Sequence, residues 1–219
     1  MVELYGVRLS MLPDHHTLIA GLRQELYEAW RAKHKNVRDD RTARSSLVAL
    51  YLLDALVPGA RLAYDGDGRP YLEDATVDFN VTHTGQMTFL AIARGEGAIV
   101  PRVGLDAEDL TRIASVRICP MAARWFSKNE YEIFLRTPDD FTFLRFWTRK
   151  EALVKWTGRG LRSLRQADTL QAGERHGVCF REYREENTLI TLCTAQGITP
   201  PPEIHMLSAE ELLAFGLSG

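Results

Sequence analysis

Two acidic residues, Asp106 and Glu108, stand two positions apart in the mainly apolar stretch Val103–Glu108. If this stretch is a strand, residues two apart point to the same face, and the two carboxylates lie side by side. Neighbouring carboxylates repel each other unless a cation or a shared proton relieves the repulsion. A hard cation with oxygen ligands, Mg²⁺ above all, suits a few carboxylates with room for phosphate and water. The alternative is a solvated strand edge with two ordinary acids.

A second pair, Glu151 and Lys155, is spaced four residues apart in the stretch Phe146–Trp156. On a helix the two side chains face the same way, one turn apart. Taken alone, such a pair is a surface ion pair that contributes about half a kcal/mol or less. The surrounding aromatic residues indicate that part of this helix is buried; they are Phe143, Phe146, Trp147 and Trp156.

A third group of polar residues lies in the stretch Phe79–Gly85, where Thr82 and Thr84 flank His83. Two hydroxyls and an imidazole at a strand end beside a glycine offer several short donors to a phosphate. Arg69 adds a fixed positive charge upstream. The alternative is a turn in which the two threonines cap their own backbone and the histidine is incidental.

The helices that would position these residues are predicted by apolar spacing and by capping residues. One helix begins at Pro13-Asp14, carries an apolar stripe every fourth residue and closes at the basic stretch 33–38; the stripe is Leu18, Leu22, Leu26 and Trp30. The other predicted helices are Arg44–Val57, a helix with a capping box from Ser127 to Leu135, Asp139–Gly158, and a short helix after Ser208.

The predicted strands are Val2–Leu9, Phe79–Val81, Phe89–Ala93, Val103–Glu108, and a hairpin of Val178–Tyr183 and Leu189–Thr194. The order strand, helices, strands therefore occurs twice, without a residue-level repeat. We expect an α+β fold, a pseudo-dimer of two similar half-domains, each a small antiparallel sheet packed with helices. The halves would be residues 1–101 and 102–219, with the active site in the cleft between them.

Composition excludes several classes of protein. The 219 residues carry 27 basic and 29 acidic side chains, and 45% are hydrophobic, which argues against disorder and against a general affinity for nucleic acid. No apolar stretch approaches the ~18 residues of a membrane span, and the first ten residues do not resemble a secretion signal. Three scattered cysteines fit free thiols in a reducing compartment. We expect a cytoplasmic protein that binds no membrane.

In their order, these stretches resemble the 4′-phosphopantetheinyl transferase superfamily, in its form with two halves in one chain. That family has a basic-Pro turn, then Phe-Asn-x-Ser-His-Ser-Gly, Gly-x-Asp-x-Glu, and Trp-Thr-x-Lys-Glu-x-x-x-Lys with a Gly-x-Gly-Leu tail. The corresponding stretches here are Gly68–Pro70, Phe79–Gly85, Gly104–Glu108, Trp147–Lys155 and Gly158–Leu161. Threonines replace both serines, and Ala107 replaces a larger aliphatic residue. The likeness extends from about Arg44 to Leu213.

The resemblance implies transfer of 4′-phosphopantetheine from coenzyme A to a serine of an apo acyl or peptidyl carrier protein, releasing adenosine 3′,5′-bisphosphate. It implies that Mg²⁺ is held by Asp106, Glu108 and Glu151. Lys155 would stabilise or protonate the leaving phosphate, and Glu151 or Glu130 would be the catalytic base. Contacts to coenzyme A would come from Arg44, Arg69, Pro70, Thr82, His83, Thr84 and Lys155.

Two other functions stay open. One is a catalytically silent module that binds coenzyme A or a carrier protein, and the other is a Mg²⁺-dependent pyrophosphate hydrolase.

The segment Arg159–Arg165 carries Arg159, Arg162 and Arg165 around Leu161 and Leu164. Such a basic patch with apolar anchors would dock an acidic carrier protein, and the alternative is a solvated basic loop. Because both halves lie in one chain, a monomer is the simpler expectation.

Overall fold

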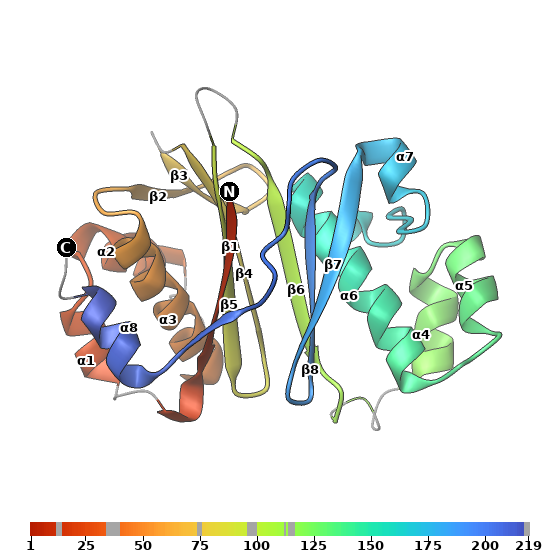
Figure 1. Cartoon of the computed structure of the whole chain (residues 1–219), viewed down its shortest axis with the longest axis horizontal. Helices are drawn as coiled ribbons and strands as arrows, with labels where there is room; N and C mark the ends of the chain where they lie inside the picture. The colour runs from red at the N-terminus through yellow and green to blue at the C-terminus, as the bar shows by residue number, and fades with distance from the viewer. Residues whose placement is uncertain are drawn as a thin grey trace.

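Two β-sheets lie face to face in the middle of the molecule, and helices cover their outer faces (Figure 1). The computed structural model describes residues 1–11, 15–33, 40–73, 76–95, 100–111, 113 and 117–216. The first sheet has the order β4 (Val77–Thr84), β5 (Met87–Arg94), β1 (Val2–Arg8) and β9 (His205–Leu207). The second has the order β6 (Val103–Asp109), β8 (Thr188–Ala195) and β7 (Val178–Glu185).

All neighbouring strands are antiparallel except β1 and β9, which are parallel. A separate two-stranded hairpin consists of β2 (Arg61–Tyr64) and β3 (Pro70–Glu73). The helices over the first sheet are α1 (His15–Ala20), α2 (Gln24–Lys33), α3 (Asp40–Leu56) and α8 (Ala209–Gly216), after a 3₁₀ turn at Leu9–Met11.

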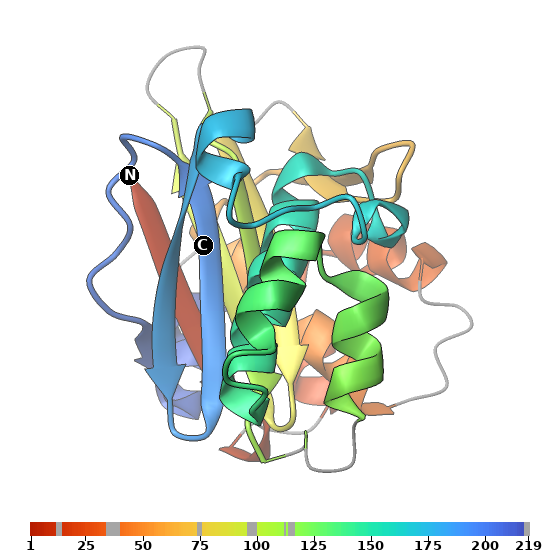
Figure 2. The same ribbon diagram turned by 90° about the vertical axis from the view of Figure 1, so that its right-hand side faces the viewer.

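The helices beside the second sheet are α4 (Ile118–Trp125), α5 (Lys128–Phe134), α6 (Asp140–Thr157) and α7 (Ala172–His176), with a 3₁₀ turn at Leu161–Ser163. Figure 2 shows α6 between the sheet and the pair α4–α5. The cluster between the two sheets is apolar and includes Leu4, Phe89, Leu105, Ile190 and Leu192. Apolar burial therefore joins the two layers of strands as well as each sheet to its helices.

The two sheets share one topology. In each, the second strand of a hairpin is central (β5 or β8), with the first hairpin strand on one side and an earlier strand on the other (β1 or β6). A long helix, α3 or α6, precedes the hairpin in both cases. The end of the chain departs from a simple division at Pro101, because β9 pairs with β1 and α8 packs on α3. Leu212 of α8 is fully buried there, so apolar burial draws residues 205–216 back to the first sheet.

The single helix predicted over residues 13–38 is wrong, because the chain breaks between α1 and α2 at residues 21–23. The Arg23 guanidinium and backbone N–H both bond to Asp54, which fixes a turn there. A Cβ on Gly21 would lie 2.7 Å from the Tyr51 ring, so the turn packs closely on α3. The predicted apolar stripe is buried as expected. Its start at Pro13-Asp14 and residues 34–38 lie outside the described part of the chain.

The other predicted helices are confirmed, including the capping box of Ser127 and Glu130 and the left-handed Gly158 that ends α6. The predicted strands are confirmed and are mostly longer than expected. Sequence patterns missed the hairpin β2–β3, helices α4 and α7, and the short strand β9. Within the described residues, no helix is long and apolar enough to cross a membrane.

Candidate active site

The site begins with a close contact between β6 and α6. Gly104 lies on β6, where a Cβ would stand 2.1 Å from the Ala152 carbonyl oxygen and 2.6 Å from the Trp156 backbone nitrogen. Only glycine permits this approach, because any side chain would displace the helix. The contact brings the C-terminal part of α6, with Glu151 and Lys155, against the strand that carries Asp106.

Lys155 and Asp106 form an ion pair at this contact, with Nζ 2.7 Å from Oδ1. The same ammonium group donates to the Leu105 carbonyl at 2.9 Å and lies 3.3 Å from the Thr82 hydroxyl oxygen. Thr82 also donates to Asp106 Oδ1, at 3.3 Å. Three residues predicted as site residues from separate motifs therefore meet at one place.

The second oxygen of Asp106 is in a different environment from the first. Asp106 is 4% exposed, and its Oδ2 accepts no hydrogen bond of normal geometry from any described residue. Burial raises the pKa of Asp106 above its ordinary value, although the Lys155 ammonium and the Thr82 hydroxyl act in the opposite direction. A buried carboxylate oxygen without a donor is costly, and a cation is one group that would offset this cost.

Glu151 experiences the same crowding of negative charge. Burial, followed by the charge of Asp106, raises the pKa of Glu151 to about 7, while Lys155 lowers it and Glu108 raises it further. The three carboxylates predicted as magnesium ligands therefore interact electrostatically. One lysine is too little positive charge to balance all three in their ionised forms.

The donor set fits a magnesium ion in its chemistry. Oxygen ligands from few carboxylates and one buried oxygen without a partner are what a hard divalent cation takes up. Within the described residues, no group of three or more His, Cys, Asp or Glu side chains stands in an arrangement that would itself hold a metal ion. Lys155 occupies one oxygen of Asp106 in this arrangement.

The edges of the two sheets meet along β4 and β6, and side chains of β4 join them. Asp78, Asn80 and Thr84 accept hydrogen bonds from backbone N–H groups of β6, at 2.8, 3.0 and 3.1 Å respectively. The donors are Val103, Leu105 and Asp109. These contacts hold the strand with Asp106 and Glu108 beside the strand with Thr82. Asp78 and Asn80 are site-positioning residues that the sequence motifs did not indicate, although the polar period of two along β4 is a usable signal.

Arg69 lies at one end of this seam and is largely buried. Its Nη2 bonds to both oxygens of Asp78 and to the Val103 carbonyl, so it ties the two edges together. Its buried Nε makes no hydrogen bond to a described residue. The next residue, Pro70, begins β3.

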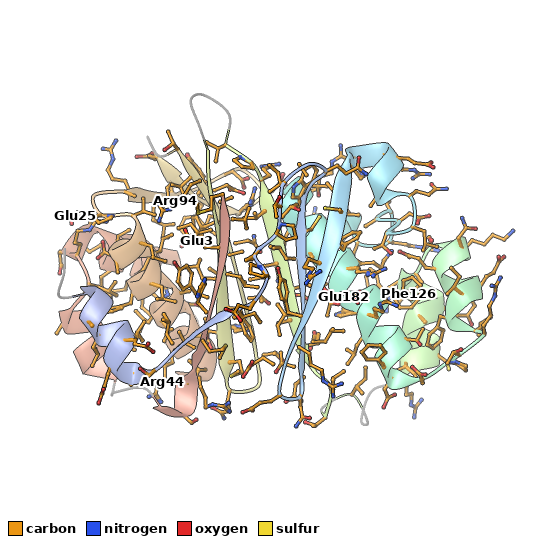
Figure 3. The ribbon with its side chains drawn as sticks, in the orientation of Figure 1. Glu3, Glu25, Arg44, Arg94, Phe126 and Glu182 are labelled. Atoms are coloured by element: carbon orange, nitrogen blue, oxygen red, sulfur yellow. The ribbon has the colours of Figure 1, made fainter. Side chains whose placement is uncertain are left out.

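Of the remaining residues predicted to contact coenzyme A, His83 and Thr84 follow Thr82 on β4, and Arg44 lies on α3. His83 is exposed at the end of β4, beside Thr84. Arg44 is half-buried on α3, and Figure 3 shows it in the helical layer over the first sheet.

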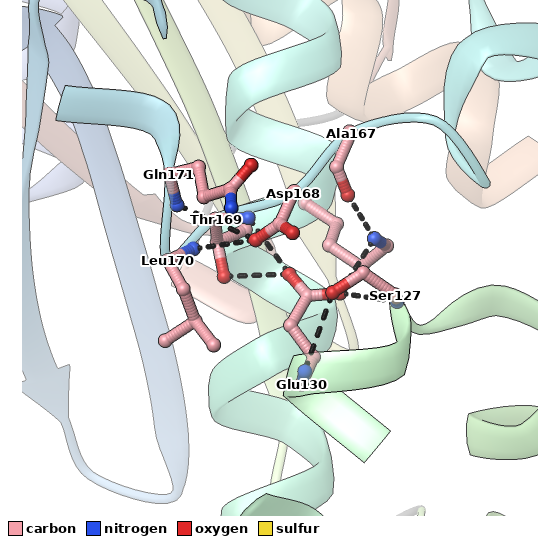
Figure 4. Close-up of polar contacts among 8 residues, drawn as sticks. Ser127, Glu130, Ala167, Asp168, Thr169, Leu170 and Gln171 are labelled. Atoms are coloured by element: carbon pink, nitrogen blue, oxygen red, sulfur yellow. Dashed lines mark hydrogen bonds and ion pairs between the residues drawn. The ribbon is translucent and has the colours of Figure 1, made fainter. Parts of the chain in front are cut away.

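Glu130 is fully buried, and both of its carboxylate oxygens accept hydrogen bonds from neighbouring residues (Figure 4). Oε2 pairs with the Lys150 ammonium at 2.8 Å and accepts the Ser127 N–H at 2.7 Å. Oε1 accepts the backbone N–H and the hydroxyl of Thr169, at 2.8 and 2.7 Å. None of these partners belongs to the Asp106–Lys155 cluster, so the structure does not bring Glu130 together with the other predicted catalytic residues.

An α+β fold with carboxylates and a lysine at a strand–helix contact suits an enzyme that handles phosphate groups. Residues 102–196 match the 4′-phosphopantetheinyl transferase superfamily. The 4′-phosphopantetheinyl transferase psf-1 of Bacillus pumilus is 30% identical over 174 residues, which cover 73% of this chain and 70% of that protein. The enzyme Sfp of Bacillus subtilis strain 168 is 28% identical over 196 residues, 82% of each chain.

A further relative, 4′-phosphopantetheinyl transferase HetI of Nostoc sp., is 29% identical over 119 residues. That match covers 51% of this chain and 47% of HetI, so it concerns about half of each protein. The match to psf-1 spans most of both proteins. The chain therefore belongs to the 4′-phosphopantetheinyl transferase superfamily and is an enzyme of that class.

Proposed function

We propose that this enzyme transfers 4′-phosphopantetheine from coenzyme A to a serine hydroxyl of an apo acyl or peptidyl carrier protein. Adenosine 3′,5′-bisphosphate is the second product. The observation that carries the proposal is the meeting of Asp106, Lys155 and Thr82 beside Glu151 at the contact of β6 and α6. These groups combine negative ligands, a mobile positive charge and a hydroxyl, as pyrophosphate cleavage requires.

The reaction breaks a phosphorus–oxygen bond of the pyrophosphate and forms one to the serine oxygen. Negative charge grows on the leaving phosphate, and the attacking hydroxyl must lie in line with the bond that breaks. Lys155 is the cation of the site, and its flexible ammonium would stabilise or protonate the leaving group. Asp106, Glu108 and Glu151 would hold Mg²⁺, which supplies charge neutralisation at the pyrophosphate.

The serine proton needs an acceptor only weakly, because a loose transition state demands little help from a base. Glu151 is the nearer candidate, although a carboxylate that coordinates a cation is a poorer base. We assign Glu130 a structural role, because three hydrogen bonds and an ion pair already use its oxygens.

Contacts to the nucleotide would come from the N-terminal part of the chain. Thr82 is already in contact with Lys155, and Thr84 and His83 follow it along β4. Arg69, in the turn before β3, and Pro70, the first residue of β3, would contact the nucleotide, and Arg44 would approach from α3. The Arg69 Nε is buried and makes no hydrogen bond to a described residue, so it is available as a donor to a phosphate.

The repeated topology supports reading the molecule as a pseudo-dimer of residues 1–101 and 102–219, with the substrate in the cleft between them. Under this reading β9 and α8 are an extension that returns to the first half. A monomer in the cytoplasm remains the prediction from the sequence.

The carrier protein would dock on the basic segment after α6. Arg159, Arg162 and Arg165 are all exposed, so their charge is available to an acidic partner. Leu164 is 3% exposed, which corrects the expectation that it is an anchor for the partner, because it packs into this protein instead. The side chain of Leu161 lies outside what the structure describes.

Release of adenosine 3′,5′-bisphosphate from coenzyme A, measured with and without apo carrier protein, tests the proposal against its alternatives. We expect release with Mg²⁺ only when an apo carrier is present. Equal release without a carrier would mean a hydrolase that uses water. Binding of coenzyme A without release on any carrier would mean a catalytically silent module.

A further inference from the structure

We propose that Glu130 and Lys150 are positioning residues that hold the chain after α6 in the conformation that receives the carrier protein. We call this chain, Arg159–Gln171, the arginine segment. The inference rests on the proposed function, since it concerns the same partner. The inference goes beyond the proposed function because it assigns the positioning of the docking segment to a buried ion pair. This pair contacts neither the proposed Mg²⁺ ligands nor the residues proposed to bind the nucleotide.

The arginine segment has little regular structure of its own. One 3₁₀ turn at Leu161–Ser163 and a few local hydrogen bonds shape it, such as those of Asp168 to the N–H groups of Leu170 and Gln171. Unlike a strand in a sheet, the segment has no ladder of backbone hydrogen bonds that fixes its position on the protein. Its position therefore depends on the few side chains that attach it.

Those attachments converge on Glu130 and Lys150 (Figure 4). Thr169 donates both its N–H and its hydroxyl to Glu130, and the Ala167 carbonyl accepts from the Lys150 ammonium. Apart from the hydrogen bonds of its two end residues, Arg159 with Thr157 and Gln171 with Arg175, these are the hydrogen bonds of the segment to the rest of the described chain. Leu164, which lies between Arg162 and Arg165 in the sequence, is itself buried, so the segment also turns one apolar side chain into the protein.

The net stabilisation from the Glu130–Lys150 ion pair is small, because the desolvation of two buried charges offsets much of their attraction. Both side chains are fully buried, and replacing a buried ion pair with apolar residues is often neutral or stabilising. Charged groups, however, bond to defined backbone atoms in one geometry, as apolar side chains do not. The pair thus specifies where the segment lies, and Lys150 directly precedes Glu151 on α6. One helix therefore presents both the carboxylate of the site and the anchor of the docking segment.

Thr169→Val tests the inference with the smallest change, because it removes the hydroxyl donor and keeps the side-chain volume. We expect KM for the apo carrier to rise about tenfold, the size of effect for a lost hydrogen bond to a charged group, with KM for coenzyme A unchanged. Hydrogen exchange of the arginine segment should become faster. Thr169→Ser retains the hydroxyl and should restore both properties.

Ser127→Ala is the matched control, because it removes the hydroxyl that caps the Glu130 backbone N–H and leaves the contacts of Thr169 in place. It should leave both KM values and the exchange of the segment unchanged. Equal rises of both KM values in Thr169→Val, or the same change in Ser127→Ala, would overturn the inference. If the wild-type protein transfers nothing to any carrier, the proposed function fails. In that case hydrogen exchange alone tests the anchoring role, and an unchanged exchange rate of the arginine segment in Thr169→Val would overturn it.

Discussion

At the scale of single residues, Asp106 is the most informative side chain. One oxygen is satisfied by Lys155 and Thr82, and the other is buried without a donor. A protein under selection for stability alone would replace such a group, so an unmet carboxylate is expected where function requires it. This is the physical reason for placing the cation at Asp106.

We predict that Asp106→Ala abolishes transfer while the protein stays folded. Loss of a ligand for the cation should lower kcat/KM by at least about 100-fold, since groups that stabilise charge in the transition state have effects of this size. Thermal stability should be equal to or above that of the wild type, because the variant removes a buried oxygen without a partner. Asp109→Ala, on the same strand, is the control and should retain most activity. Near-normal turnover of Asp106→Ala would show that the metal assignment is wrong.

The raised pKa of Glu151 predicts how stability depends on pH without a divalent cation. The folded protein holds this proton up to about pH 7, whereas an unfolded glutamate releases it near 4.5. The folded state therefore binds more protons in this window, and its stability falls as pH rises from 4.5 to 7. The loss from this group is roughly 2 to 3 kcal/mol.

Urea unfolding in a chelator, at pH 5 and pH 8, measures this dependence. Glu151→Gln has no titrating group at this position and should flatten the change. A pH dependence identical in the two proteins would contradict the electrostatic account of the site.

The pairing of Glu151 with Lys155 and of Asp106 with Glu108 could be read from spacing, because helix and strand periods are local. The contact of Thr82 with Asp106 could not, since it depends on how β4 and β6 approach each other. Nor could the burial of Glu130, whose capping position alone indicates an exposed helix end.

At the scale of elements, the contact of β6 with α6 fixes the geometry of the site. Gly104 allows the backbone of the helix to approach the strand, and Lys155 reaches Asp106 across that contact. The glycine was recognised from the sequence only as part of a motif. The structure supplies the reason for a glycine at this position, because α6 packs directly against Gly104.

We predict that Gly104→Ala destabilises the protein by about 3 kcal/mol or more, because the new methyl group would overlap backbone atoms that cannot move independently. Activity should fall with it, since α6 must shift away from Asp106. The urea midpoint and kcat/KM measure the two effects. Gly66→Ala, at a position with open space around the new carbon, should change neither. A wild-type midpoint in Gly104→Ala would contradict the close contact.

Elements with strong local signals were predicted, and those without were missed. The helix α6 has an Asp139 cap, a long apolar face and a glycine at its end. By contrast, α4 has no side-chain cap at Arg117, and β9 is three residues long and is held by its pairing with β1. Such elements depend on their neighbours in the fold more than on their own sequence.

At the scale of the whole molecule, two layers of strands joined along β4 and β6, with α6 packed on β6, form a framework, and the arginine segment lies outside it. The framework carries the groups of the site, and the arginine segment presents positive charge at the surface. Division of the task between a rigid site and a charged docking segment is consistent with recognition of a macromolecular substrate.

We predict that charge reversal at Arg162 and Arg165 raises KM for an acidic carrier protein and leaves KM for coenzyme A unchanged. Electrostatic steering acts on the macromolecule, so added salt should weaken carrier recognition in the wild type more than in the variant. Steady-state kinetics with each substrate varied in turn measures this. Arg31→Glu, an exposed position on α2, is the matched control. Equal effects on the two KM values would contradict a docking role for the segment.

The intact mass of an apo carrier protein, after incubation with the enzyme, coenzyme A and Mg²⁺, tests the central claim most directly. We predict a gain of one phosphopantetheine on the carrier, lost when Mg²⁺ is omitted or when Asp106→Ala replaces the wild type. A full gain with Asp106→Ala, or no gain on any carrier from a folded wild-type protein that binds coenzyme A, would contradict the account.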